Sequence, residues 1–135
     1  MNLLIIYAVT FVVFFLVDII WLGFISKPFY AKYLGNLRSE KVNWPAALIF
    51  YFLFIGGLVF FAINPAIAKE SLTDALLIGG FFGLIAYSTY DLTNLATLKD
   101  WPVIVTIVDI IWGTILNSAT AGITYLIVVN LLNLK

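Results

Sequence analysis

Four runs of apolar residues divide this sequence, and each is long enough to cross a lipid bilayer as a helix. A helical span needs roughly 20 apolar residues. Only 10% of the chain is charged, whereas soluble domains carry about 25% charged residues. We therefore predict an all-α polytopic membrane protein, with four transmembrane helices in one up-and-down bundle that covers residues 1–135. The predicted spans are residues 3–25, 45–63, 75–96 and 102–129.

Prolines and short polar segments mark the ends of these spans. Residues 27–28 (Lys-Pro) end the first span and residues 64–65 (Asn-Pro) end the second, because proline cannot continue the helical hydrogen-bond ladder. Residues 44–45 and 101–102 (both Trp-Pro) begin the second and fourth spans, since proline is tolerated in a first turn. Residues 71–74 have the spacing of a capping box and begin the third span.

The connection between the first two spans, residues 27–43, is basic and aromatic. Its apolar side chains follow helical spacing: Phe29, Tyr30, Tyr33, Leu34 and Leu37. This pattern predicts a short interfacial helix on the membrane surface. An ordered loop with aromatic anchors fits the same pattern equally well.

The basic residues predict the orientation of the spans, because cytoplasmic loops carry an excess of Lys and Arg. In a four-span protein the first and third connections share one side, and the termini share the other side with the second connection. The first side has Lys27, Lys32, Arg38, Lys41 and Lys99, and the second has Lys69 and Lys135. We therefore expect a multi-pass protein of the cytoplasmic membrane with both termini outside.

Three aspartates fall inside the predicted spans: Asp18, Asp91 and Asp109. Two of them belong to a repeated pentapeptide, Val-Asp-Ile-Ile-Trp, at residues 17–21 and 108–112. With a rise of about 1.5 Å per residue, all three carboxylates lie roughly 8–10 Å from the cytoplasmic ends of their helices. We therefore expect the three acids to share one polar pocket on the cytoplasmic side.

Acids inside a bilayer are candidates for a functional site. No Lys or Arg lies within a predicted span, so the acids must hold protons, face water, bind a cation or be reached by Lys27 or Lys99. Six further side chains are expected around the pocket: Tyr87, Tyr90, Asn94, Asn117, Trp21 and Trp112. The structural alternative is that each acid ties two helices together by accepting hydrogen bonds from these side chains.

The composition removes several kinds of chemistry. The chain has no His and no Cys, which excludes the commonest general base, the commonest zinc ligand and thiolate catalysis. We predict no cofactor. The carboxylates of Asp18, Asp91 and Asp109, with Asn94, are oxygen ligands of the kind that Mg²⁺ prefers, so a magnesium site would form only if the acids meet in the fold. A net charge of zero gives no indication of a nucleic-acid partner.

Three functions remain open at this point. A proton-linked transporter would exchange protons on the acids for a small cation or an amphiphile, and because four spans are few for one pathway, we would expect a homodimer. An enzyme acting on a lipid or isoprenoid would use the carboxylates as acid and base or to hold Mg²⁺. A structural or accessory subunit would use them as interhelical ties. The expected partners are the lipid bilayer and a small-molecule or lipid ligand.

Each of these functions predicts a different arrangement of cavities and hydrogen bonds inside the helix bundle. A transporter requires a water-filled path that reaches both sides, through the bundle or a dimer interface. An enzyme requires a blind pocket that opens laterally to the lipid. A structural tie requires no pocket, and every aspartate oxygen should be bonded to a Trp, Tyr or Asn donor.

Residues 90–97 (Tyr-Asp-Leu-Thr-Asn-Leu-Ala-Thr) are followed by Trp-Pro at 101–102 and Val-Asp-Ile-Ile-Trp-Gly at 108–113. In this segment the chain resembles the bacterial family filed as domain of unknown function number 2177, and the resemblance covers nearly the whole chain. It implies a small protein of the bacterial inner membrane with no assigned activity. It supplies no catalytic residues.

Overall fold

The computed structural model describes residues 3–21, 23, 27–35 and 43–133. This part of the chain is helical and contains no strand. In chain order the elements are α1 (Leu3–Trp21), α2 (Lys27–Leu34), α3 (Trp44–Leu58), the π-helical turn η3 (Val59–Ile63), α4 (Asn64–Ala68), α5 (Leu72–Thr97), α6 (Val103–Leu126) and the π-helical turn η4 (Ile127–Leu131).

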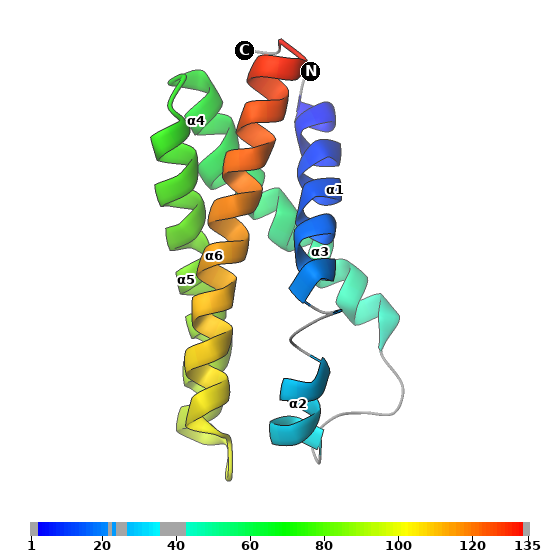
Figure 1. Ribbon diagram of the computed structural model, residues 1–135, viewed down its shortest axis with the longest axis vertical. Helices are drawn as coiled ribbons and strands as arrows, with labels where there is room; N and C mark the ends of the chain where they lie inside the picture. Colours follow the sequence, from blue (N-terminus) through cyan, green and yellow to red (C-terminus); the bar gives the residue numbers. More distant parts are fainter. Residues whose placement is uncertain (1–2, 22, 24–26, 36–42, 134–135) are drawn as a thin grey trace.

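Four helical segments are long and apolar enough to cross a membrane. They are Leu3–Trp21, Trp44–Ala68, Leu72–Thr97 and Val103–Leu131, which confirms the prediction of an all-α protein with four transmembrane helices. The chain passes up and down the bundle, so both termini lie at one end, with α2 at the other end (Figure 1).

The end of the second span differs from the prediction. The second span continues beyond Pro65 to Ala68 instead of ending at residue 63. Its π-helical turn η3 lies directly before Pro65, and the Asn64 N–H bonds to the carbonyl of Val59, five residues earlier. Pro65 then falls in the first turn of α4, where a missing N–H is tolerated. The first helix ends at Trp21, and the predicted end at residue 25 lies outside the described residues.

Side-chain caps begin two of the helices. The Asn43 side chain accepts a hydrogen bond from the Ala46 N–H at 3.2 Å, with proline in the first turn of α3. The Ser71 hydroxyl accepts from the Asp74 N–H at 3.0 Å. Such caps satisfy N–H groups that have no partner within the helix, so both helices begin close to the positions that the sequence predicts.

The closest contact in the bundle is between α5 and α6. A Cβ atom on Gly83 would lie 2.4 Å from the carbonyl oxygen of Gly113, and one on Gly79 would lie 2.6 Å from the Cβ of Ala121. Larger side chains at these two positions would push the helices apart. Small residues of this kind allow close packing between membrane helices, and α5 and α6 form the most extensively packed pair among the described helices.

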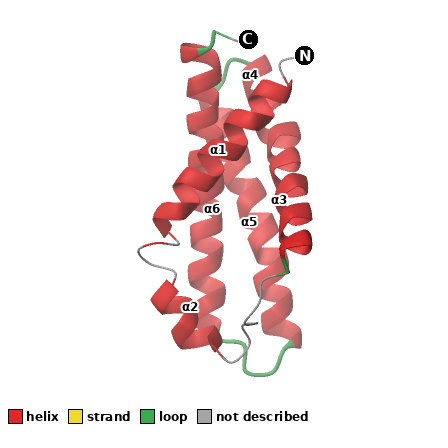
Figure 2. Ribbon diagram, turned by 90° about the vertical axis from the view of Figure 1, so that its right-hand side faces the viewer, coloured by secondary structure: helices red, strands yellow, loops and turns green. Residues whose placement is uncertain are grey.

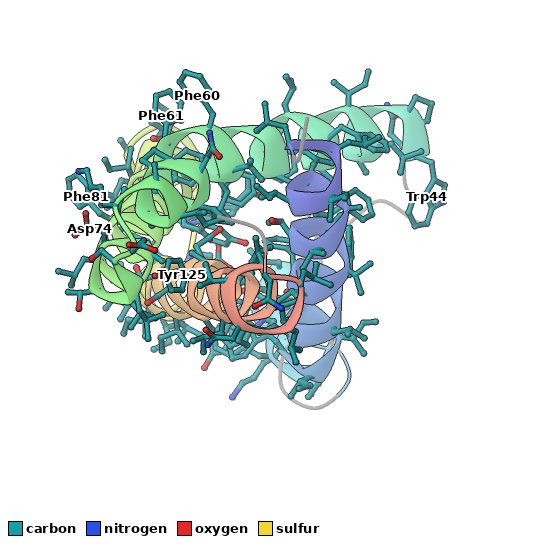
Figure 3. The ribbon with its side chains drawn as sticks, turned by 90° about the horizontal axis from the view of Figure 1, so that it is seen from above. Trp44, Phe60, Phe61, Asp74, Phe81 and Tyr125 are labelled. Carbon is teal, nitrogen blue, oxygen red and sulfur yellow. The ribbon has the colours of Figure 1, made fainter. Side chains whose placement is uncertain are left out.

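The other two spans are inclined to this pair. Seen from above, α1 and α3 run across the view in different directions (Figure 3). Ring contacts hold α1 to α3, for example Phe15 with Tyr51 at 5.0 Å and Phe11 with Phe52 at 5.3 Å. The second span packs on α5 mainly through η3 and α4. Consequently α3 is farther from α5 near its start than near its end, and this divergence positions the cavity described below.

Candidate functional site: an aspartate cluster beside an aromatic cavity

The three aspartates project from three different helices. Asp18 on α1 and Asp91 on α5 are buried, and Asp109 on α6 is partly buried. The Asp109 carboxyl group lies within electrostatic range of both Asp18 and Asp91. We call these three residues the aspartate cluster, with Asp109 as the member that interacts with the other two.

Asp18 is held by the tryptophans of the repeated pentapeptide. The indole Nε1 of Trp112 donates a long hydrogen bond to Asp18 Oδ1 at 3.4 Å. Trp21 and Trp112 stack with their ring centroids 4.6 Å apart and their planes 10° from parallel. The two copies of the pentapeptide thus form one contact between α1 and α6, in which Asp18 has the role of a polar tie.

Asp109 accepts a hydrogen bond from a residue that sequence reasoning did not assign to the site. The Tyr30 hydroxyl of α2 donates to Asp109 Oδ1, across 79 positions of sequence. Figure 2 shows α2 below the end of α1 and beside the lower half of α6. Burial, followed by the hydrogen bond to Asp109, raises the pKa of the Tyr30 hydroxyl, so this group remains a donor. The only signal in the sequence was the aromatic, helically spaced pattern of the connection.

Among the three acids, Asp91 has the fewest described partners that could stabilise a negative charge on its carboxyl group. It is fully buried, and neither carboxyl oxygen has a hydrogen-bond partner among the described residues. Its backbone carbonyl accepts from Thr106 Oγ1 at 3.4 Å, and that hydroxyl accepts from Trp101 Nε1 at 3.0 Å. An ionised carboxylate is costly to bury without a partner. A proton, or a positive charge shared with Asp109, would compensate it.

A cavity of about 330 Å³ adjoins Asp109. Its other lining residues are Phe50 and Phe54 on α3 and Ala86, Tyr87 and Tyr90 on α5. The side chains of Phe50 and Tyr90 are 52% and 57% exposed, so the cavity opens through the flank of the bundle, between α3 and α5. It presents aromatic walls and a carboxylate to a ligand.

Tyr87 forms the wall of this cavity next to α6, beside Asp109. Its ring lies over Gly113 of α6, where a Cβ atom would be 2.2 Å from the ring, and it lies edge-on to Phe54 with the centroids 6.4 Å apart. Tyr87 is within electrostatic range of all three acids. A glycine at position 113 is therefore required for the ring to lie against α6 in this position.

Neither asparagine of the predicted set lines the cavity. Asn117 is fully buried, but it is eight residues along α6 from Asp109, or about 12 Å. Its Nδ2 donates to the Gly113 carbonyl at 2.7 Å, within the contact between α5 and α6. Asn94 lies near the Tyr90 hydroxyl and is not among the residues that line the cavity.

The described side chains supply no basic partner to the cluster. No ion pair joins a described Lys or Arg to these acids, and the Lys69–Asp74 pair at 3.6 Å lies at the start of α5, at the opposite end of the bundle (Figure 1). The Lys27 side chain lies outside the described part. No group of three or more His, Cys, Asp or Glu among the described residues is arranged to hold a metal ion.

Comparison with protein families gives one match. The family described as "Predicted membrane protein (DUF2177)" matches residues 3–126. The comparisons with curated proteins and with solved structures returned no match.

Proposed function

Because this chain belongs to the DUF2177 family of predicted membrane proteins, a description that names no activity, we infer its function from the aspartate cluster and the cavity beside it. We propose that the protein is a proton-linked transporter of cationic amphiphiles. The observation that carries the proposal is the aromatic cavity of about 330 Å³ that has the Asp109 carboxylate in its lining.

The chemistry of the cavity defines the ligand class. Aromatic walls bury apolar groups and attract cations over the ring faces. The carboxylate then provides the charge that pairs with the cation. A ligand with a hydrophobic body and one positive charge, such as a quaternary ammonium or a protonated amine, satisfies both requirements.

Proton coupling follows from competition at the carboxylates. The Asp91–Asp109 pair is compensated either by a proton or by the ligand's positive charge, because two neighbouring buried carboxylates repel each other when both are ionised. Ligand binding therefore releases a proton, and protonation releases the ligand. We further propose that the protein lies in the bacterial cytoplasmic membrane, with the cluster toward the cytoplasm, and that a homodimer completes the path.

A second candidate is an intramembrane enzyme that acts on a lipid or isoprenoid. The observation that favours it is the lateral opening of the cavity between α3 and α5, which faces the lipid in a membrane. In that case Asp91 and Asp109 would serve as acid and base. The accessory-subunit alternative is less favoured, because a structural tie should have a Trp, Tyr or Asn donor, and among the described residues none donates to either Asp91 carboxyl oxygen.

Calorimetric binding of tetraphenylphosphonium to the detergent-solubilised protein tests the proposal. We expect saturable binding that weakens on acidification and releases about one proton per cation, detected by repeating the titration in buffers of different ionisation enthalpy. Asp109→Asn should abolish this binding, whereas Asp74→Asn, at the opposite end of the bundle, should retain it. Binding that survives Asp109→Asn, or no binding to the wild type, would rule the proposal out.

Transport separates the two candidates once binding is established. In proteoliposomes, a transporter accumulates the labelled cation against a gradient when a proton gradient is imposed. An enzyme with the same cavity binds the cation but does not accumulate it.

A further inference from the structure

A row of buried polar side chains continues along α6 beyond the aspartate cluster. We call Asn117, Thr120 and Thr124 the α6 polar stripe, and all three are fully buried. At about 100° per residue, these three positions and Asp109 fall within an arc of roughly 80° on the helix. The stripe therefore continues the face of α6 that carries the acid.

The polar atoms of this stripe lack partners. Asn117 Oδ1, Thr120 Oγ1 and Thr124 Oγ1 have no hydrogen-bond partner among the described residues. Threonines elsewhere on these helices behave differently and donate to the carbonyl four residues earlier, at 2.7 or 2.9 Å: Thr10, Thr89, Thr97 and Thr114. Buried polar groups in native proteins are nearly always bonded to protein or to internal water. The hydroxyls of the stripe are thus available to water inside the bundle.

The spacing of these groups suits a chain of single waters. Successive members of the stripe are three or four residues apart, or about 4.5–6 Å along the helix. One water bonded on both sides bridges about 5.5 Å. Asn117 Nδ2 is also bonded to the carbonyl of Gly113, the residue over which the Tyr87 ring lies. The Gly113 carbonyl is four residues, or about 6 Å, from Asp109, so it is the one polar group that shortens the step of about 12 Å between the stripe and the acid.

Helix α1 supplies a further polar group at the same height. Asp18 and Trp112 are hydrogen-bonded between α1 and α6. From this contact, Thr10 lies eight residues along α1 and Thr120 lies eight residues along α6, and on both helices this is toward the end where the termini lie. Thr10 and Thr120 are therefore at the same height in the bundle. Thr10 is fully buried, and its hydroxyl donates to Ile6, so its oxygen can still accept a bond from water.

Beyond Thr124 the helix changes to the wider π-helical turn η4 (Ile127–Leu131). The Ile127 N–H is shared between the carbonyls of Ile123 and Thr124. A π-helical turn departs from the regular α-helical ladder and is frequent at functional sites. This turn lies at the end of the bundle where the two termini are found (Figure 1), so the row of polar groups points to that face.

We propose that the α6 polar stripe is a hydrated proton path that joins the aspartate cluster to the membrane face at which the termini lie. The proposal rests on the proposed proton-linked function. A proton taken from water at that face passes along the chain, with each water or hydroxyl receiving one proton and donating another. It ends on a carboxylate oxygen of Asp91 or Asp109. The amphiphile reaches the same acids through the flank cavity, so proton and substrate use separate routes.

The test measures proton flux without the amphiphile. Proteoliposomes that contain a pH-sensitive dye are given a potassium diffusion potential with valinomycin, and the rate of internal pH change is recorded. The variant Thr120→Val/Thr124→Val keeps side-chain shape and removes both hydroxyls. We expect its flux to fall at least about tenfold, because a hydrogen-bonded chain is interrupted at two points.

Three comparisons show whether the hydroxyls are responsible. Thr120→Ser/Thr124→Ser keeps the hydroxyls and should retain the flux. Thr114→Val removes a hydroxyl that is bonded to Ile110 on the same helix and should leave the flux unchanged. Tetraphenylphosphonium binding by the double valine variant should also be unchanged, since the stripe does not line the cavity.

Failure of the path and failure of the proposed function give different results. The path is overturned if the double valine variant conducts protons like the wild type, if Thr114→Val reduces the flux as much, or if wild-type flux does not exceed that of protein-free liposomes. If flux depends on the stripe but the cation does not bind, the path stands and the amphiphile as substrate is wrong.

Discussion

At the scale of single residues, the three acids of the cluster differ in the donors that they receive. Asp18 accepts from Trp112, and Asp109 accepts from Tyr30. Asp91 has no bonded carboxyl oxygen among the described residues. A negative charge is therefore stabilised least at Asp91. Proton exchange should concentrate on the Asp91–Asp109 pair, with Asp18 serving mainly to join α1 and α6.

Tyr30→Phe tests the contact between α2 and the cluster. The pKa of the Tyr30 hydroxyl is raised above its usual value of 10.0. The contribution of this hydroxyl to the free energy of unfolding is therefore fully present below pH 10.0. It is lost at higher pH, because the tyrosine of the unfolded chain then ionises while the folded one does not. The loss is at most about 1.4 kcal/mol per pH unit, and less here because the hydroxyl is partly exposed. Thermal unfolding in detergent should show that Tyr30→Phe is less stable than the wild type near neutral pH. The difference between their unfolding temperatures should become smaller above pH 10.0.

The matched control for this measurement is Tyr33→Phe. Tyr33 lies on the same helix and contacts Phe29 with the ring centroids 5.0 Å apart, and it is not bonded to Asp109. A stability gap for Tyr30→Phe that stays constant with pH would show that the Tyr30 hydroxyl is not buried against the carboxylate.

At the scale of helices, the position of the cluster depends on the close approach of α5 and α6. Gly83→Ala should destabilise the protein by about 1–3 kcal/mol, the usual range for an overpacked contact, because its Cβ would lie 2.4 Å from a backbone oxygen. Gly80→Ala is the matched control, since its Cβ would meet Ser118 at an ordinary 3.4 Å. We expect that variant to be unchanged or stabilised by up to about 1 kcal/mol. Unfolding by a denaturing detergent in mixed micelles measures both, and equal effects would contradict the close approach at Gly83.

The helices could be predicted from the sequence because their signals are local. Apolar length, prolines at residues 45 and 102, and the capping spacing at 71–74 each act over a few residues. The proline at residue 65 was misread because a proline that follows a helix and one in the first turn of the next segment look alike in sequence. The π-helical turn η3, which contacts α5 and α6, distinguishes the two in the structure.

The candidate site was less accessible to sequence reasoning, because it depends on helix rotation and on which helices are neighbours. Depth follows from the helix ends and a fixed rise, so similar depths could be assigned to Asp18, Asp91 and Asp109. Asn117 shares a face with Asp109 yet lies two turns away along the helix. Tyr30 comes from a surface connection, and its contact with α6 spans 79 positions, so no local pattern could reveal it.

At the scale of the whole molecule, the two ends of the bundle have different contents. The end that carries α2 holds the aspartate cluster and the aromatic cavity. The end that carries the termini holds the α6 polar stripe and the π-helical turns η3 and η4. A protein that exchanges a proton for an amphiphile needs such a difference, because the two species should reach the same acids from different directions. The direction of transport then depends on which end faces the cytoplasm.

The orientation can be measured because the chain contains no cysteine, so a single introduced thiol reports one position. Ala31 on α2 and Ala68 at the end of α4 are both exposed, and replacing them leaves the charge of the connections unchanged. The excess of basic residues on the α2 side predicts that this end is cytoplasmic. In intact cells, a membrane-impermeant maleimide should label Ala68→Cys and should label Ala31→Cys only after permeabilisation. The reverse pattern would place the aspartate cluster on the outer side, and the proposed proton path would then run from the cytoplasm to the acids.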